Sequence, residues 1–278
     1  MRIGFIGAGL MGHGMVLGLL KGGHQVSVIA HRNRCPIEDL VARGAAEAPD
    51  LKTIALNSDH IFLCLSNSKI VKEIIAGLKP NLKNGQIIID TSTSEPKVTR
   101  QLAAELTKLG VAFVDAPLTG GPEQATKSEL GVLCGASPEI FEVIDPLLAC
   151  FASTIRHMGP AGSGHTAKLI SNYLVTGMIA LVAEAFGTAR EANIDWRNLY
   201  EAMLNGSGNS GVLRKMVEPA LRGDFEGYKF SVNNAHKDIV YFKNLGHPAA
   251  LADAVEAVFT KAVEQGHGQQ NVSHILKS

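Results

Sequence analysis

Apolar and polar residues over the first 160 positions alternate between short apolar segments and stretches with helical periodicity. The apolar segments predict strands, in chain order Arg2–Gly7, Gln25–Ala30, His60–Leu65, Gln86–Asp90, Ala112–Asp115, Gly131–Cys134 and Ser153–His157. Between strands, apolar residues recur at helical spacing, as they do from Leu10 to Leu20. This alternation is typical of βαβ units in a parallel sheet, so we expect an α/β domain.

The pattern changes after Met158. A glycine-rich joint over residues 159–164 leads into a long helical run, from about His165 to Asn193, with no clear strand beyond it. Shorter helical runs follow at Trp196–Leu204, Val212–Leu221, Asn233–Leu245 and Ala250–Gln265. We therefore expect an α/β domain over residues 1–161 and an all-α domain over residues 162–278, joined through the long interdomain helix.

Charge and hydropathy limit the kinds of partner. The chain has 278 residues, and its 26 Lys and Arg residues balance its 26 Asp and Glu residues, with a pI near 7.2. This balance argues against dedicated binding of nucleic acid or of an anionic membrane. The longest apolar stretch, Leu169 to Ala183, is interrupted by Ser171 and Asn172, so we expect no membrane span.

The four cysteines are far apart and form no CxxC pair; they are Cys35, Cys64, Cys134 and Cys150. That spacing is typical of reduced thiols in the cytosol rather than of a disulfide framework or a zinc site. The ten histidines show no paired metal-ligand spacing. We expect a soluble, cytoplasmic protein without a bound metal ion.

A glycine motif follows the first predicted strand and opens a helix. Residues 7–12 match GxGxxG, in which the first glycine permits a tight turn and the second lets the backbone approach a pyrophosphate. The third glycine allows close packing of helix on strand, and the N–H groups at the helix start hold the phosphates. The motif predicts a Rossmann-type, mostly parallel sheet. The expected cofactor contacts are Gly7, Ala8, Gly9, Leu10, Met11 and Gly12.

The end of the second predicted strand bears on the choice of cofactor. An NAD site usually has an acidic residue about 20 residues past the glycine motif. Here the chain reads Ala30-His31-Arg32-Asn33-Arg34, with no acidic residue before Glu38. An arginine at that place can bind a 2′-phosphate, so we expect NADP, with Arg32 as the leading contact, Arg34 as the second and Asn33 between them. NAD stays possible, and a solvated basic turn is the alternative interpretation.

Lys168 and Asn172 are four residues apart at the start of the long helix. This spacing places both on one face, beside the domain joint, where small-molecule sites tend to form. Desolvation among Ala167, Leu169 and Ile170 would lower the pKa of the lysine and suit it to general acid–base work. Spacing alone nevertheless favours a surface lysine and a helix-side amide.

Four segments of the chain, taken in order, carry a family resemblance. They are the glycine loop from Gly4 to Gly12, Asp115-Ala116-Pro117-Leu118-Thr119-Gly120-Gly121, the run from Gly162 to Asn172, and Lys237-Asp238-Ile239. With these segments the chain resembles the β-hydroxyacid dehydrogenase family, which includes 3-hydroxyisobutyrate dehydrogenase, tartronate semialdehyde reductase and the glyoxylate/succinic semialdehyde reductases. Together the four segments span essentially the whole chain. The full-length 6-phosphogluconate dehydrogenases share this design but have longer C-terminal regions.

The resemblance implies roles for residues at a catalytic centre. Lys168 would be the catalytic acid–base, and Asn172 would help to hold the substrate beside it. Thr119, Gly120 and Gly121 would bind the substrate carboxylate through a hydroxyl and backbone N–H groups.

The same resemblance implies further cofactor contacts. Thr93 falls where the family places such a contact, and Lys237 corresponds to the lysine that reaches the cofactor from the helical domain. The loop Leu65-Ser66-Asn67 follows a parallel strand and suits the same task. On residue type alone, Lys237-Asp238 would be a solvated ionic face.

Two departures from the family pattern concern the substrate pocket. The carboxylate motif usually has Ser where this chain has Thr119, and the segment from Gly121 to Leu130 lacks two glycines of the usual pattern. These changes leave the identity of the substrate open.

We therefore expect an oxidoreductase that transfers hydride between NADP(H) and a small carboxylate with a nearby alcohol or aldehyde. Alternatives are a sulfolactaldehyde- or imine-type reductase on the same scaffold, or a non-catalytic NADP-binding interaction module. Imine reductases of this kind usually replace the catalytic lysine, so Lys168 counts against them. We also expect a homodimer or homotetramer formed through the long helix and the helical domain.

Overall fold

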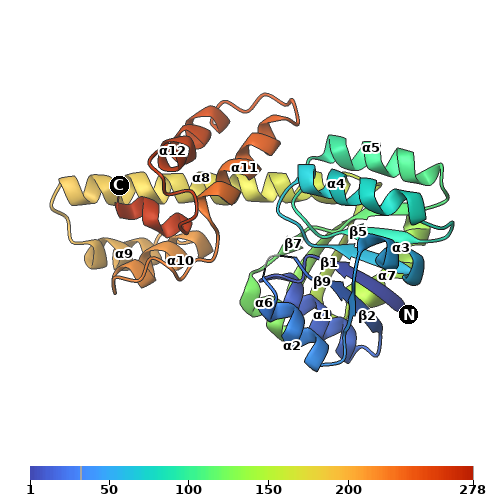
Figure 1. Cartoon of the computed structure of the whole chain (residues 1–278). Helices are drawn as coiled ribbons and strands as arrows, with labels where there is room; N and C mark the ends of the chain where they lie inside the picture. The colour runs from blue at the N-terminus through green and yellow to red at the C-terminus, as the bar shows by residue number, and fades with distance from the viewer. Residues whose placement is uncertain (32, 278) are drawn as a thin grey trace. The chain divides into compact units, whose positions relative to one another are not determined.

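The computed structural model describes residues 1–31 and 33–277, and the chain divides into two compact units. The first, Met1–Lys168, carries the sheet, and the second, Leu169–Ser278, is helical (Figure 1). We call them the sheet unit and the helical unit, and describe each by itself.

The sheet has the strand order β3-β2-β1-β4-β5-β6-β8-β7, with β9 paired to β8. Its strands are β1 (Arg2–Ile6), β2 (Gln25–Ile29), β3 (Ala46–Ala48), β4 (His60–Leu63), β5 (Ile87–Asp90), β6 (Ala112–Asp115), β7 (Leu118–Thr119), β8 (Leu130–Gly135) and β9 (Ala152–Gly159). The strands from β3 to β6 are parallel, while β8 runs antiparallel to β6 and β7. The seven predicted strands are confirmed, and the Rossmann-type sheet with them. The short strands β3 and β7 were not predicted.

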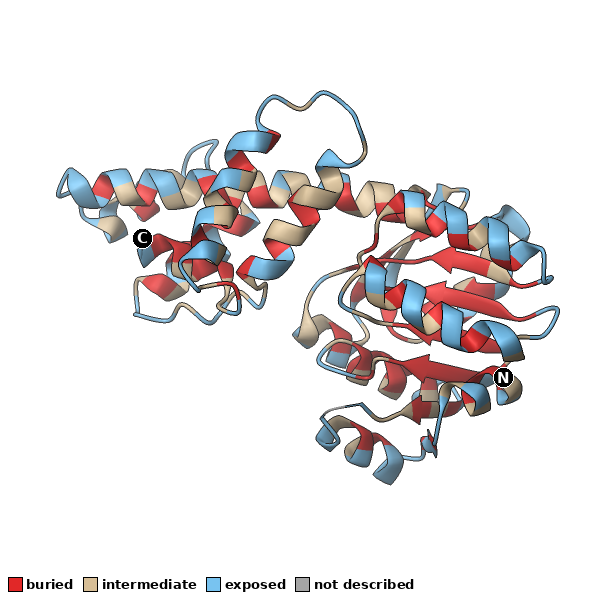
Figure 2. Cartoon of the chain, turned by 45° about the horizontal axis from the view of Figure 1, so that its top comes forward, coloured by how far each residue is buried: buried red, intermediate tan, exposed pale blue. Residues whose placement is uncertain are grey.

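Helices cover both faces of this sheet. They are α1 (Gly12–Lys21), α2 (Cys35–Ala42), α3 (Leu51–Asn57), α4 (Ser68–Leu78), α5 (Pro96–Thr107), α6 (Pro122–Lys127) and α7 (Pro138–Leu148), with a short 3₁₀ turn at Lys79–Asn81. Along β1, Ile3 and Phe5 enter one core with α1, α2 and α7, whereas Ile6 enters another with α3, α4 and α5. The central strands β1, β4, β5 and β6 are accordingly buried along most of their length, whereas β9 is mostly exposed, and the helices keep an exposed side (Figure 2). This is the pattern expected of a parallel sheet covered on both faces.

The helical unit packs around the long helix α8 (Ser163–Glu191). It contains α9 (Trp196–Leu204), α10 (Gly211–Ala220), α11 (Val232–Lys243), α12 (Ala252–Glu264) and a final 3₁₀ segment, Val272–Lys277. The predicted helices are confirmed within two residues at each end, but the final 3₁₀ segment was not predicted. Asp195 caps α9, because its Oδ1 accepts the Asn198 N–H at 2.8 Å, and Trp196 packs edge-on against Phe186.

Helix α8 is long and apolar enough, by length and composition, to cross a membrane. The sequence predicts no membrane span, because its longest apolar stretch, Leu169 to Ala183, is interrupted by Ser171 and Asn172; the helix as a whole is nevertheless apolar despite these two polar groups. The core helix of a soluble protein passes the same test, and within this helix Asn172 and Thr176 are buried and hydrogen-bonded.

Candidate active site

Loops from three strands meet at the carboxyl edge of the parallel sheet. Backbone hydrogen bonds continue past the strand ends, from the Cys64 N–H to the Ile6 carbonyl at 2.9 Å and from the Thr91 N–H to the Leu63 carbonyl at 2.8 Å. The glycine loop, the loop after β4 and the loop after β5 are therefore neighbours. Ligands of open α/β sheets bind at this edge.

The glycine loop has the conformation that its three glycines predict. Gly7 has φ +98°, and a side chain on it would collide with the Cys64 carbonyl. A Cβ on Gly12 would lie 2.8 Å from the Phe5 ring, whereas one on Gly9 would meet nothing within 4 Å. Gly9 thus leaves open space in front of the start of α1. The loop fits a dinucleotide pyrophosphate, whose phosphates the N–H groups of this turn would hold.

Cys64 lies beneath this loop and is not a reactive thiol. Burial raises its pKa to about 11, although hydrogen bonds with the Thr91 side chain and the Gly12 N–H act in the opposite direction. The side chain is therefore neutral near pH 7 and places no charge beside the pyrophosphate position.

The loops after β4 and β5 support each other. The Leu65 N–H donates to Ser92 Oγ at 2.9 Å, and Asn67 Oδ1 caps α4 by accepting the Ile70 N–H at 3.0 Å. Ser92 and its neighbours are buried, while Thr93 is half-buried. Thr93 is therefore the residue of its loop best placed for the predicted cofactor contact.

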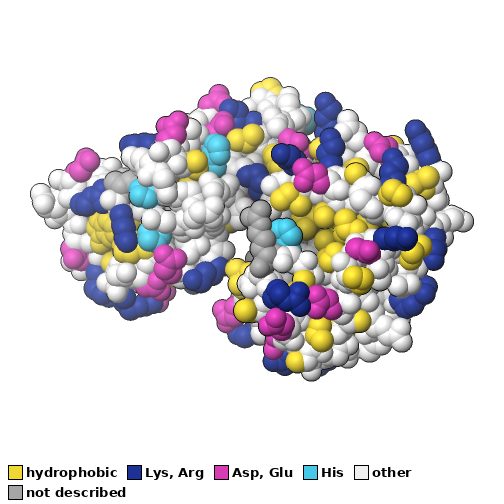
Figure 3. Space-filling model, in the orientation of Figure 1, with side chains coloured by type: hydrophobic (Ala, Val, Ile, Leu, Met, Phe, Trp, Pro, Cys, Tyr) yellow, Lys and Arg dark blue, Asp and Glu magenta, His cyan; other side chains and the backbone are white. Residues whose placement is uncertain are grey.

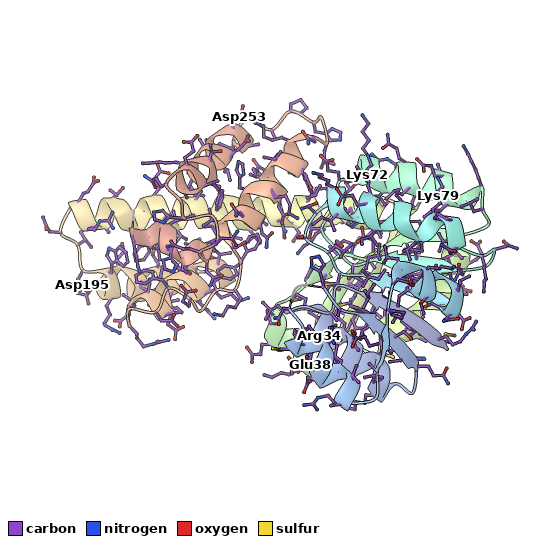
Figure 4. The ribbon with its side chains drawn as sticks, viewed as in Figure 1. Arg34, Glu38, Lys72, Lys79, Asp195 and Asp253 are labelled. Atoms are coloured by element: carbon purple, nitrogen blue, oxygen red, sulfur yellow. The ribbon has the colours of Figure 1, made fainter. Side chains whose placement is uncertain are left out.

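In the basic turn after β2, Arg34 is less available to a phosphate than the sequence suggests. Arg32, the predicted leading contact, lies outside the described residues. Arg34 pairs with both oxygens of Glu47 at 3.0 and 3.1 Å and with Glu38 at 3.4 Å (Figure 4). A 2′-phosphate would have to compete with these carboxylates for Arg34. Asn33 accepts the Cys35 N–H through its side-chain oxygen.

The segment predicted to bind a carboxylate forms β7 and a tight turn. Thr119 pairs with Gly131 across the antiparallel β8, and Gly120 has φ +103°, which favours glycine. The Gly121 N–H donates to Gln124 Oε1 at 2.9 Å. Gln124 would have to release this N–H before Gly121 could bind a carboxylate through it.

The start of α8 is capped from the sheet. The Asp115 carboxylate, at the end of β6, accepts the N–H groups of Gly162 at 2.6 Å and His165 at 2.7 Å. Lys168 follows one turn later, half-buried, as the last residue of the sheet unit. Burial raises the pKa of Asp115, while the two N–H bonds and His165 favour its charged form.

Asn172 and Lys237 share one partner in the helical unit. The Asn172 Nδ2 donates to Asp238 Oδ2 at 2.6 Å, and Lys237 Nζ lies 3.1 Å from the other carboxylate oxygen. Asp238 is buried on α11, and Lys237 also lies over the ring of Tyr241 at 5.2 Å. Because a carboxylate only accepts hydrogen bonds, the Asn172 amide oxygen points away from Asp238.

Sequence reasoning gave no role to Asp115, Asp238 or Gln124. Asp115 and Asp238 lie inside segments that resemble the family, and this position could have indicated a role at the site. Gln124 stands where the family pattern usually has glycine. This departure from the pattern was therefore a signal that the residue could affect the site.

The sheet, its glycine loop and the following helical unit define an NAD(P)-dependent oxidoreductase of the Rossmann class. Residues 2–159 match the NAD-binding domain of 6-phosphogluconate dehydrogenase. Residues 162–278 match the NAD-binding domain of NADP-dependent 3-hydroxyisobutyrate dehydrogenase. The chain belongs to the 3-hydroxyisobutyrate dehydrogenase-like family of β-hydroxyacid dehydrogenases.

Relatives of known activity cover nearly the whole chain. A 2-(hydroxymethyl)glutarate dehydrogenase from Eubacterium barkeri is 31% identical over 99% of this chain and 94% of its own length. The 2-hydroxy-3-oxopropionate reductase of Escherichia coli is 30% identical over 95% of this chain and 89% of its own length. The crystal structure of a 3-hydroxyisobutyrate dehydrogenase from Salmonella typhimurium matches with a TM-score of 0.89 at 27% identity, over 100% of this chain and 99% of that one.

Proposed function

We propose that the chain transfers hydride between NADP(H) and a small β-hydroxyacid or semialdehyde carboxylate, with Lys168 as general acid and base. The observation that carries this proposal is the place of Lys168, one turn into a helix whose start Asp115 caps. Asn172 follows one turn later on the same face of α8. The names of the related enzymes specify hydroxy acids, which supports the substrate class.

Each group has one role in reduction and the reverse role in oxidation. When bound, the nicotinamide supplies hydride to the substrate carbon in reduction and accepts it in oxidation. In reduction, the Lys168 ammonium donates a proton to the carbonyl oxygen as it becomes an alkoxide, which gives an alcohol; in oxidation, the neutral amine accepts the hydroxyl proton. The single hydroxyl hydrogen of the substrate goes to Lys168, and Asn172 helps to hold the substrate beside that lysine; its Nδ2 is held by Asp238, so its amide oxygen is the group left for this contact.

The carboxylate of the substrate would lie against the turn after β7. The Thr119 hydroxyl and the Gly120 N–H are the donors, and Gly121 joins them when Gln124 releases its N–H. Backbone N–H groups in such a turn hold an anion without a cationic side chain.

NADP is the preferred cofactor in this proposal. Its support is the absence of an acidic residue at the end of β2, the pair Arg32 and Arg34, and the NADP-dependent description of the family matched by residues 162–278. Asn33, Leu65, Ser66, Thr93 and Lys237 complete the proposed cofactor contacts. NAD is the alternative if Arg34 keeps its carboxylate partners.

The proposal includes an oligomer formed through α8. Ile170, Leu174 and Leu181 lie along this helix and are 54%, 65% and 67% exposed. A second copy would remove these apolar side chains from water. Charged side chains of both signs are interspersed over the face seen in Figure 3. Light scattering should therefore give a dimer or tetramer; a monomer at working concentration contradicts this part.

Two further parts of the proposal concern the chain as a whole. We place the domain division at residues 161 and 162, where the glycine-rich joint meets α8. We also place the enzyme in the cytoplasm, on the strength of its four free cysteines.

The test measures NADPH oxidation with glyoxylate, succinic semialdehyde and tartronate semialdehyde, with NADH in parallel. Lys168→Ala should lower kcat about 10²- to 10⁴-fold, the usual size of general acid–base help. Lys72→Ala, an exposed lysine on α4, is the matched control and should leave kcat unchanged (Figure 4).

The same assay separates the alternatives. Full activity in Lys168→Ala contradicts the role of the lysine. Turnover of imines or of sulfolactaldehyde alone would replace the substrate class. Tight NADPH binding without turnover of any of these compounds would favour a non-catalytic module.

A further inference from the structure

Three ionisable side chains form a cluster within the sheet unit, and none of them takes part in the proposed proton and hydride transfer. They are Asp90 at the end of β5, Asp115 at the end of β6 and His165 in the first turn of α8, and each is 0% exposed. Buried ionisable groups are stable only when they are paired and hydrogen-bonded. The cluster therefore joins two strand ends to the helix that carries Lys168.

Both ring nitrogens of His165 are engaged. Its Nε2 lies 3.0 Å from the Ser92 carbonyl, and its Nδ1 lies 2.7 Å from Thr99 Oγ1 on α5. A carbonyl only accepts hydrogen bonds, so Nε2 carries a hydrogen and donates it to Ser92. The carboxylates of Asp90 and Asp115 lie 3.9 and 3.8 Å from the ring nitrogens. His165 is thus fixed from the loop after β5, from α5 and from β6.

Asp90 shapes the loop to which His165 is attached. Its Oδ1 accepts the Ser92 N–H at 3.0 Å, and its Oδ2 accepts the Ser94 hydroxyl at 3.1 Å. Thr93 stands between these two residues. The loop that carries this proposed cofactor contact therefore has its shape set by Asp90 and is hydrogen-bonded to His165.

Two glycines leave the space that the Asp115 cap requires. A Cβ on Gly135 would lie 2.8 Å from the Asp115 carboxyl carbon, and a Cβ on Gly164 would lie 3.0 Å from its Oδ2. The cap and the histidine are therefore parts of one tightly packed arrangement.

We propose that His165 is a positioning residue for the proposed reaction. It ties the first turn of α8, where Lys168 lies three residues further on, to the loop that carries Thr93. A displacement of 1 Å at a reacting group can lower a rate about 10²-fold. Holding the base and the cofactor loop through one imidazole reduces such displacements. This inference rests on the proposed roles of Lys168 and Thr93.

The experiment is a double-mutant cycle measured by single-turnover oxidation of NADPH. His165→Leu removes both hydrogen bonds at similar size and should lower the rate about 10- to 100-fold, while the Kd of NADPH rises less than threefold. In the Lys168→Ala background the same change should cost less than threefold, because the group that it positions is absent. His165→Gln, whose amide can donate to Ser92 and accept from Thr99, should recover the rate to within fivefold.

Two further variants distinguish a positioning role of His165 from a general effect on the structure. His60→Leu replaces a buried histidine at the amino end of β4, the opposite edge of the sheet from these loops, and should leave the rate unchanged. Thr99→Val removes only one partner of the ring and should show the same non-additivity with Lys168→Ala, at a smaller size, even if His165→Leu does not fold.

Several outcomes overturn the inference. An equal loss for His165→Leu in both backgrounds, no recovery by His165→Gln, or a tenfold rise in the NADPH Kd at unchanged saturated rate would each do so. If Lys168→Ala itself retains the wild-type rate, the proposed function fails instead. If Lys168→Ala is inactive and His165→Leu keeps full activity, only the positioning role fails.

Discussion

The sheet unit and the helical unit hold their site residues by different means. Around the glycine loop, the support comes from the main chain and from glycines that leave no room for side chains, as at Gly7 and Gly12. In the helical unit, Asn172 and Lys237 depend on one buried carboxylate, Asp238, which lies 66 residues from Asn172. A side chain forced into the packed glycine positions should therefore change folding and binding together, whereas loss of Asp238 should act mainly on kcat/KM.

The largest effect should come from the glycine loop. Gly12→Ala drives a methyl group against the Phe5 ring, so it should lower the free energy of unfolding by about 1–3 kcal/mol and abolish NADPH binding. Gly9→Ala has open space for its methyl group, so it should fold normally and weaken only NADPH binding. Urea unfolding and NADPH fluorescence titration measure the two quantities. Equal stability loss in both variants would contradict the interpretation of Gly9 as the pyrophosphate position.

The matching test in the helical unit is Asp238→Leu. Loss of a charged hydrogen-bond partner, worth about 1.5–3 kcal/mol, should lower kcat/KM roughly 10- to 100-fold, while the Kd of NADPH rises by a smaller factor because Lys237 loses its carboxylate partner. Asp238→Asn keeps an acceptor for Asn172 but loses the charge beside Lys237, and should lie between this variant and the wild type. Steady-state kinetics decide the matter. The comparison breaks down if Asp238→Leu keeps wild-type kcat/KM.

A smaller, stabilising effect is expected at Ser128. This residue ends α6 with φ +58° and ψ +36°, a left-handed conformation that is costly for any residue except glycine. Ser128→Gly should raise the free energy of unfolding by about 1 kcal/mol, less the extra entropy of the unfolded chain. Thermal unfolding measures the change. A lower melting temperature would show that the serine side chain makes a compensating contact.

The smallest effect concerns the basic turn after β2. Glu47→Gln removes the charge that holds Arg34, and exposed pairs of this kind are worth about 0–1 kcal/mol. The variant should bind NADPH up to about fivefold more tightly and NADH unchanged. Titration with both cofactors is the measurement. An equal gain for NADH would exclude a 2′-phosphate contact as its source.

Local patterns in the sequence were enough for most of the fold. The strands and the long helix follow from apolar segments and periodicity, and the glycine loop follows from its motif. The strands β3 and β7 were missed because two or three residues carry no measurable period. Strand β3 also contains only alanine and glutamate, which are poor strand formers.

The supporting residues of the site could not be predicted in this way. His165 bonds a carbonyl 73 residues away, and Asn172 bonds a carboxylate 66 residues away, so no local spacing reports either contact. Arg34 was correctly noted as a basic residue of the turn, but its pairing with Glu47 depends on the edge strand that the sequence did not reveal. The sequence thus predicts a set of candidate residues, but not the long-range hydrogen bonds that hold them in place.

The four thiols of this enzyme differ in reactivity, so that one of them can be labelled selectively. Cys64 and Cys134 have pKa values raised by burial to about 11 and about 12, and burial also raises the pKa of Cys150. These three react slowly with electrophiles, whereas Cys35 is exposed at the first residue of α2, beside Arg34. A maleimide dye added in limiting amount would therefore attach at Cys35. The native chain would then carry a fluorescent reporter next to the turn that we propose distinguishes NADP from NAD, with no engineered cysteine.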